Sequence, residues 1–208
     1  MKKLICLFGF SVAGVGIEVH AQHEYDFIEA RVEYIELDNL DSLGDPQTLT
    51  GYTYQLGASY DLNNDVVLVA SIEQTDFDES LGFSNQQRIV SIGAGYHYPI
   101  LADADVYGYV SYASIDTDLD SGSEDDQGVL ALIGVRVFTS QRWEFTGAIE
   151  YAGIEDPLQE TDSEVSIKGD TRWHFAERMS VSVGAAYGED RLSVSVNFRF
   201  SMDGIRVF

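Results

Sequence analysis

Ionisable side chains recur at every second position of one segment near the end of this sequence. Its alternate positions are occupied by Lys168, Asp170, Arg172 and His174. Successive side chains of an extended strand point to opposite sides, so these four residues would share one face of a strand. Charges held together in an enclosed space are paired with one another, or they line a passage for ions. The segment therefore predicts either a network of ion pairs or a constriction that contacts ions and small solutes.

Other segments carry charges at alternate positions too, and we expect them to face the same interior from neighbouring strands. Their signs nearly cancel, which favours a salt-bridged network that fills the interior over an open constriction. The expected charge network consists of Glu29, Arg31, Glu33, Arg136, Glu144, Glu150, Lys168, Asp170, Arg172 and Arg199.

A second cluster of oxygen ligands begins like a calcium loop. Asp116, Asp118 and Asp120 place carboxylates at alternate positions, as such loops do. Ser121 then stands where a calcium loop needs glycine, and Gln127 stands where it needs a bidentate glutamate. We expect at most a weak contact with Ca²⁺ or another divalent cation here, the alternative being a solvated acidic loop. No other cofactor is expected.

The histidines argue against an enzyme. Acid–base or nucleophilic catalysis of the common kinds needs a histidine beside an acid or a serine at one accessible end of the fold. His20 and His23 lie at the N-terminus, whereas His97 and His174 each come just before a predicted short turn at the opposite end. We therefore expect no catalytic site.

Charge and the N-terminus restrict the class of protein. The chain has 208 residues and a formal net charge of −23, which argues against nucleic acid as a partner because the phosphate backbone would be repelled. Lys2 and Lys3 precede a short apolar run, and residues 1–21 resemble a cleaved signal peptide; a buried N-terminal helix is the alternative. Cys6 lies within that segment, so the exported chain would have no disulfide.

The elements that must position these residues are strands. In LSVSVNFRF, residues 192–200, one alternate set is apolar and the other is polar, so one face of the strand is hydrocarbon. Similar alternation predicts ten strands, most of them long enough to cross a membrane at a tilt. They span residues 25–37, 50–62, 66–75, 88–98, 105–115, 128–138, 142–152, 164–175, 179–188 and 191–200. For residues 105–115 the pattern leaves open which face is apolar.

The connections alternate in length and charge. Those after odd-numbered strands are mostly long and acidic, at 38–49, 76–87, 116–127 and 153–163. Those after even-numbered strands are short, at 63–65, 99–104, 139–141 and 176–178. Long loops at one end and tight turns at the other are typical of outer-membrane barrels. A soluble lipocalin-like barrel or sandwich is the alternative, because it shares the alternation of side chains.

Several stretches carry a resemblance to a known group. Residues 56–78, 90–118, 134–151 and the closing LSVSVNFRF resemble small bacterial outer-membrane β-barrels of the OmpA/OmpX-like class, and more closely a ten-stranded subset described as quorum-factor-like outer-membrane proteins. Members of this group usually end at the aromatic residue that closes the last strand. This chain continues beyond Phe200 with the tail SMDGIRVF, residues 201–208.

Taken together, these patterns predict an all-β, ten-stranded antiparallel transmembrane barrel over residues 22–200, with short periplasmic turns and longer acidic extracellular loops. We expect an exported monomer in the outer membrane of a Gram-negative bacterium, in contact with outer-membrane lipid and lipopolysaccharide and inserted by the barrel-assembly machinery. Its expected role is structural or surface-interacting, with a lumen plugged by paired charges. The alternative is a small porin-like channel for ions or small solutes.

Overall fold

Ten strands make up the regular structure of the chain. The computed structural model describes residues 25–40, 46–62, 65–78, 86–119, 122–154, 163–189 and 191–202. The predicted signal peptide and residues 203–208 of the tail lie outside the described residues. The strands are β1 (Phe27–Leu40), β2 (Pro46–Asp61), β3 (Val66–Phe77), β4 (Gln86–Leu101), β5 (Ala104–Leu119), β6 (Gly122–Ser140), β7 (Trp143–Gly153), β8 (Glu164–Ala176), β9 (Met179–Tyr187) and β10 (Arg191–Ser201).

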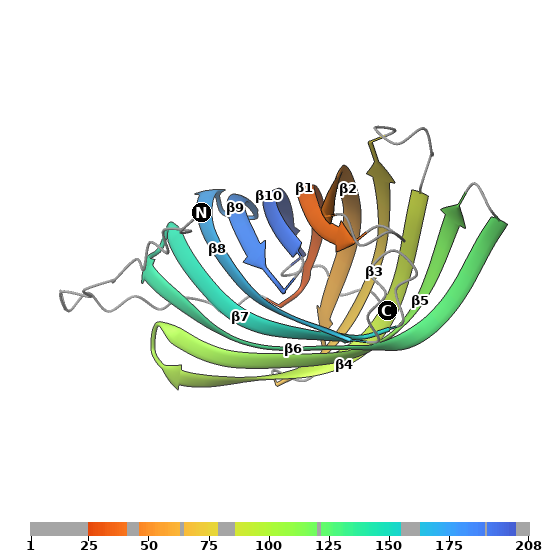
Figure 1. Cartoon of the computed structure of the whole chain (residues 1–208). Coiled ribbons are helices and arrows are strands. Elements are labelled where there is room, and N and C mark those ends of the chain that lie inside the picture. Colours follow the sequence, from red (N-terminus) through yellow and green to blue (C-terminus); the bar gives the residue numbers. More distant parts are fainter. Residues whose placement is uncertain are drawn as a thin grey trace.

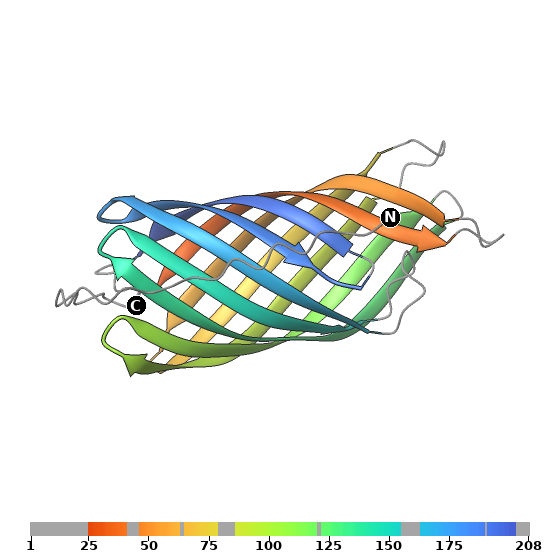
Figure 2. The same cartoon turned by 60° about the vertical axis from the view of Figure 1, so that its left-hand side comes forward.

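The strands form one closed antiparallel barrel. Each strand pairs with its neighbours in the sequence, and β1 pairs with β10 to complete the ring, with Phe27 opposite Ser201 and Leu37 opposite Arg191. The strands run at a tilt around the barrel, as Figures 1 and 2 show from two directions. The prediction of an all-β, ten-stranded antiparallel barrel is confirmed. Among the described residues, no helix is long and apolar enough to cross a membrane.

Alternation decides which side chains face outward. In β10 the apolar set Leu192, Val194, Val196 and Phe198 is exposed, whereas Ser193, Ser195 and Asn197 are buried. The same division holds around the ring, because β-branched and aromatic residues alternate with small or polar ones in strand after strand. The barrel therefore has a hydrocarbon exterior and a polar bore, the inverse of a soluble barrel.

The two ends of the barrel differ in their connections. At the end that we call the turn end, two-residue turns at residues 102–103, 141–142 and 177–178 join successive strands. The strands reach closer to these turns than expected: Pro99 lies inside β4, beside a shift in register between Pro99 and Leu101. A proline is tolerated at such an irregularity because the regular ladder is already interrupted there.

The opposite end, the loop end, carries the longer connections, and one of them differs from the prediction. Residues 116–127 were expected to form a loop, yet most of them extend β5 and β6 as a hairpin, in which Asp116 pairs with Asp125 and Leu119 pairs with Gly122. Backbone pairing does not require apolar side chains, so an acidic composition does not exclude a strand.

The structure also settles the faces of β5, which the sequence left open. Val110 and Tyr112 are exposed, whereas Ala113 and Ile115 are buried inside the barrel. Tyr107 and Tyr109 face the bore, each opposite a glycine of a neighbouring strand. A Cβ on Gly134 would lie 2.7 Å from the ring of Tyr107, and a Cβ on Gly95 would collide with Tyr109. These glycines make room for the two rings.

Candidate functional site

The bore holds all ten residues of the predicted charge network. Glu29, Arg136, Glu144, Asp170, Arg172 and Arg199 line a central cavity of about 180 Å³, Glu33 and Glu150 line a second cavity of about 250 Å³ nearer the loop end, and Arg31 and Lys168 line both. A third cavity of about 470 Å³ opens at the turn end, beside His174 and Arg178.

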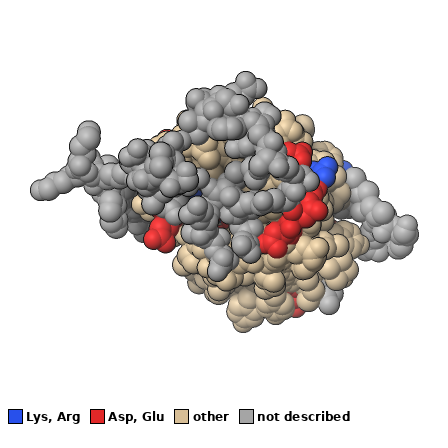
Figure 3. Space-filling view, turned by 45° about the vertical axis from the view of Figure 1, so that its right-hand side comes forward, with Lys and Arg blue, Asp and Glu red and all other residues tan. Residues whose placement is uncertain are grey.

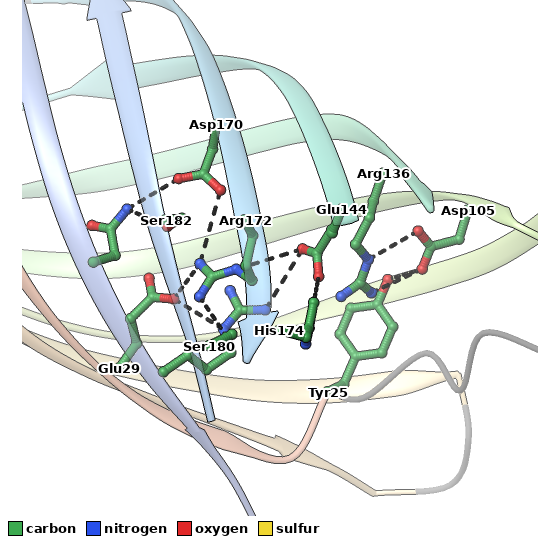
Figure 4. Close-up of polar contacts among 12 residues, drawn as sticks. Tyr25, Glu29, Asp105, Arg136, Glu144, Asp170, Arg172, His174, Ser180 and Ser182 are labelled. Carbon is green, nitrogen blue, oxygen red and sulfur yellow. Dashed lines mark hydrogen bonds and ion pairs between the residues drawn. The ribbon is translucent and has the colours of Figure 1, made fainter. Parts of the chain in front are cut away.

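Two arginines and two glutamates form the centre of the network. Arg172 in β8 donates to Glu29 in β1 at 2.6 Å, and Arg199 in β10 donates to the same Oε2 atom at 2.9 Å. Both arginines also approach Glu144 in β7, at 3.7 and 3.8 Å. These four residues come from strands on both sides of the β1–β10 seam, as Figure 4 shows for the three that are labelled.

The carboxylate of Glu144 also contacts a histidine. His174 lies 3.0 Å from Glu144 and is exposed enough to reach the cavity at the turn end. Glu144 itself is almost fully buried. Its carboxylate is thus held by two arginines and one histidine, an arrangement that satisfies a buried charge with several partners.

A second group of contacts at the turn end involves a residue that precedes the first strand. Tyr25 donates its hydroxyl hydrogen bond to Asp105, and Arg136 donates two bonds to the same carboxylate, at 2.9 and 3.2 Å. The ring of Tyr25 stacks on His97 at 3.8 Å, and the guanidinium of Arg136 lies 4.2 Å from the Tyr25 ring centre. Tyr25 therefore inserts into the bore and is held from several sides (Figure 4).

The side-chain amide of Asn197 connects the centre of the network to the charges nearer the loop end. Asn197 accepts a hydrogen bond from Arg31 at 2.7 Å and donates to Asp170 and to Ser182 at 3.0 and 2.9 Å. Asn197 is 1% exposed, so these bonds satisfy an amide that has no access to water. Through this residue, charges in β1 and β8 belong to one continuous network.

Nearer the loop end the charges are fewer. Arg191 and Arg31 both pair with Glu33, at 3.0 and 3.6 Å, and Lys168 pairs with Glu150 at 2.6 Å. Glu73 differs from these carboxylates, because it accepts a hydrogen bond from the neutral Gln55 at 3.3 Å. Among the residues that the structure describes, Glu73 forms no ion pair.

Above these charges the inner wall becomes apolar. Two clusters of buried hydrophobic residues point into the bore at the loop end, and we call them the apolar collar. The inner face at this end also carries buried polar side chains, Thr75, Gln87 and Thr117. The collar consists of Ile35, Leu37, Leu49 and Phe77 in one cluster, and of Ala113, Ile115 and Ile154 with Ile89 and Leu130 in the other.

The predicted divalent-cation contact lies in the hairpin at the loop end. Asp116 pairs with Arg88 across the β4–β5 ladder, and Asp118 is exposed, while Asp120 lies outside the described residues. The hydrogen bond from Arg88 lowers the pKa of Asp116, and the hydrogen bond with Asp116 raises the pKa of Asp125. Within the described part of the chain, no group of three or more histidine, cysteine or acidic side chains could hold a metal ion. The weak contact stays a prediction.

Sequence reasoning missed four residues of the network: Tyr25, Asp105, Arg191 and Asn197. The signal for Asp105 was present in the register, because it stands directly opposite Arg136 once β5 and β6 are aligned. Tyr25 carried no such signal, since it precedes β1 and enters the bore from outside the ladder.

Comparisons with known proteins bear on the fold. No protein-family model matches the chain, and no curated protein matches it. Among solved structures, the translocator domain of the autotransporter NalP from Neisseria meningitidis aligns at 10% identity with a TM-score of 0.54, over 85% of this chain and 88% of that one. The NanC porin aligns at 9% identity with a TM-score of 0.53, over 84% of this chain and 100% of that one.

A third solved structure agrees with these two. An outer-membrane channel from Pseudomonas putida F1 aligns at 9% identity with a TM-score of 0.52, over 90% of this chain and 99% of its own length. At such low identity the likeness concerns the path of the backbone and carries no site residue across. The chain has the fold of the outer-membrane β-barrels.

Proposed function

We propose that this protein is an outer-membrane β-barrel whose bore is closed by paired charges, and that it serves a structural or surface-interaction role. The observation that carries the proposal is the network around Glu29, in which Arg199 of the adjacent strand β10 and Arg172 of β8 bind one carboxylate. A passage for ions needs charges that are free to exchange partners, and these are engaged with one another.

The proposed membrane location rests on the hydrophobic side chains that cover the outer face of the barrel. Large hydrophobic side chains are exposed around the whole ring, among them Ile92 at 68%, Ile133 at 60% and Val183 at 57%. Such a surface exceeds the apolar patches that soluble monomers expose. Aromatic residues stand at both margins of this belt, with Trp143 against Trp173 at the turn end and Tyr34 against Tyr52 at the loop end. Aromatic girdles of this kind mark the two interfaces of a bilayer.

The expected partners follow from the same surface. A closed ring leaves no unpaired strand edge to recruit a second copy, so the barrel is proposed to be monomeric. Its belt contacts outer-membrane lipid and lipopolysaccharide, and its insertion depends on the barrel-assembly machinery and on export through a cleaved signal peptide. A folded chain that remains soluble after complete removal of detergent would contradict this assignment.

Planar-bilayer recording tests whether the bore is closed. Wild-type protein is expected to give no conductance steps. Arg136→Ala and Arg172→Ala each remove a guanidinium that fills the bore, and each is expected to produce steps. Arg142→Ala is the matched control, because Arg142 is an exposed arginine of the turn between β6 and β7. Silent recordings from both bore variants, with folding verified, would contradict the plug.

The alternative function is a small porin-like channel for ions or small solutes. The three cavities along the bore favour it, because only side chains separate volumes of about 470, 180 and 250 Å³. Reproducible single-channel steps from the wild-type protein would support the channel and exclude the closed bore.

A further inference from the structure

A hollow interrupts the outer face of the barrel over β4, β5, β6 and β7, and we call it the outer hollow. Its volume is about 450 Å³, and every residue that lines it is apolar or a tyrosine. Gly108 contributes to its floor and stands between Tyr96 of β4 and Ile133 of β6 in the ladder. A Cβ added to Gly108 would meet one atom of another strand, the carbonyl oxygen of Leu132 at 3.2 Å. No side chain of a neighbouring strand therefore covers this glycine.

Larger side chains surround Gly108 and form the walls of the outer hollow. Ile149 continues the row of Gly108 and Ile133 into β7. Tyr98 stands toward the turn end of β4 and Tyr151 toward the loop end of β7, so the hollow has a tyrosine toward each end of the barrel. Its volume is about fifteen times the share of one water molecule in the liquid, which leaves room for a large part of an acyl chain.

The location of the outer hollow indicates a hydrocarbon occupant. The hollow belongs to the outer face, which exposes large hydrophobic side chains, and Figure 3 shows acidic side chains around the loop end beside an outer surface with few charges. An unfilled hollow costs the atoms of its lining their dispersion contacts. A flexible acyl chain can follow a concave surface, whereas a second barrel presents a convex wall and would leave part of the hollow empty.

Two tyrosine hydroxyls indicate the orientation of the lipid. Tyr96 and Tyr98 are exposed on the outer face of β4, and both lie in the half of that strand nearer the turn end. Neither hydroxyl forms a hydrogen bond to a described residue, whereas Tyr112 on the same outer face donates to Gln127. Phenol donors of this kind suit the ester and phosphate oxygens of a lipid headgroup, and tyrosine is enriched where headgroups lie.

We propose that the outer hollow is a specific binding site for one phospholipid of the leaflet at the turn end. One acyl chain lies over Gly108 and against Ile133, and the hydroxyls of Tyr96 and Tyr98 donate hydrogen bonds to oxygens of the headgroup region. The site rests on the proposed membrane location, but it requires neither an open nor a closed bore.

Native mass spectrometry of the full chain in detergent tests the proposal, with dipalmitoyl phosphatidylethanolamine as the added lipid. One phospholipid should remain bound to each barrel under activation that removes the detergent. A graded series of lipids without a preferred number, equal retention of lipid A, or a dimer in place of the lipid-bound monomer would each overturn the proposal. A barrel that inserts into vesicles but retains no lipid would contradict this site alone and leave the membrane location intact.

Two pairs of variants locate the bound lipid. Ala131→Trp fills the outer hollow and should lower the affinity for the phospholipid by about tenfold or more, whereas Ala185→Trp, on the outer face of β9 and outside the hollow, should not. Tyr98→Phe removes one hydroxyl and should lower the affinity by about threefold, with Tyr60→Phe as control, because Tyr60 is exposed at the turn end of β2 and outside the hollow.

Equal effects within either pair would overturn the assignment of the lipid to this hollow. If Ala131→Trp fails to fold, the comparison of Tyr98→Phe with Tyr60→Phe still decides, because both substitutions keep the ring and remove only a hydroxyl.

Discussion

The two halves of the bore are built differently. In the turn half, Glu29, Glu144 and Asp105 each have at least one arginine partner, and rings such as Tyr25 pack among these charges. In the loop half an apolar collar closes the wall, and Glu73 has no basic partner among the described residues. The carboxylates at the centre of the turn half are paired with arginines, whereas Glu73 in the loop half forms no ion pair to a described residue.

This difference bears on stability. Charges that neutralise one another hold the wall of the barrel together. A carboxylate such as Glu73, which forms no ion pair to a described residue, carries the cost of burial with less compensation. We therefore expect substitutions of chemically equal residues in the two halves to have opposite effects.

The largest effect is expected from glutamate-to-glutamine changes. Glu29→Gln removes the carboxylate to which Arg172 and Arg199 both donate, leaves them only longer contacts with Glu144, and should lower the free energy of unfolding by about 3 kcal/mol. Glu73→Gln removes an unpaired charge and should raise it, by on the order of 1 kcal/mol. Urea unfolding in lipid vesicles measures both, with Glu177→Gln at an exposed turn as control. Changes of the same sign would break the comparison between the halves.

A smaller loss is expected in the collar. Ile115 is 3% exposed and packs with Ala113 and Ile154, so Ile115→Ala should cost about 2–3 kcal/mol through the cavity it leaves. Because no charge is involved, the loss should stay the same in low and high salt. A loss that disappears in high salt would show that the collar depends on the ion pairs below it.

Tyr25→Phe tests a single hydrogen bond of the turn half. The substitution keeps the ring that stacks on His97 and removes the hydroxyl that donates to Asp105. Arg136 still pairs with that carboxylate, so the expected loss in unfolding free energy is about 1 kcal/mol. A thermal scan of the folded barrel by circular dichroism measures it. A loss as large as that of Glu29→Gln would show that Tyr25 has a greater part in closing the bore.

The smallest effect is expected outside both halves, in the exposed hairpin. Arg88→Gln removes the partner of Asp116, and since both side chains are solvated the unfolding midpoint should not change. Calorimetry with millimolar Ca²⁺ on the same variant tests the weak divalent contact, which should strengthen once Asp116 is free. No heat from either the wild type or the variant would rule that contact out.

Much of the architecture follows from the sequence because alternation and loop length are local properties. Ten strands, their order and their outward faces could be read in this way, as for Leu192 to Phe200 in β10. The faces of β5 could not, because Tyr107 and Tyr109 are as apolar as the residues on the outer face of the barrel. Their inward placement depends on Gly134 and Gly95 across the ladder, and that pairing appears only once the register is known.

The site was predictable only in part, for a related reason. The alternating charges of β1 and β8 reveal that a network exists, but not which residues pair. The Glu29–Arg199 contact depends on the meeting of the first and last strands, and Asn197 joins the network only because β1 and β10 align at Arg31. Tyr25 enters from outside any strand, so no periodicity marks it.

The seam between β1 and β10 has a consequence for the order of assembly. Glu29 and Arg199 are 170 residues apart in the chain, so their contact has one of the longest sequence separations in the protein. Contacts of this kind form late, after intervening hairpins have been laid down. An interaction absent from the transition state slows unfolding without speeding folding. Contacts across the β1–β10 seam should therefore slow the unfolding of the assembled barrel without raising the rate at which it assembles.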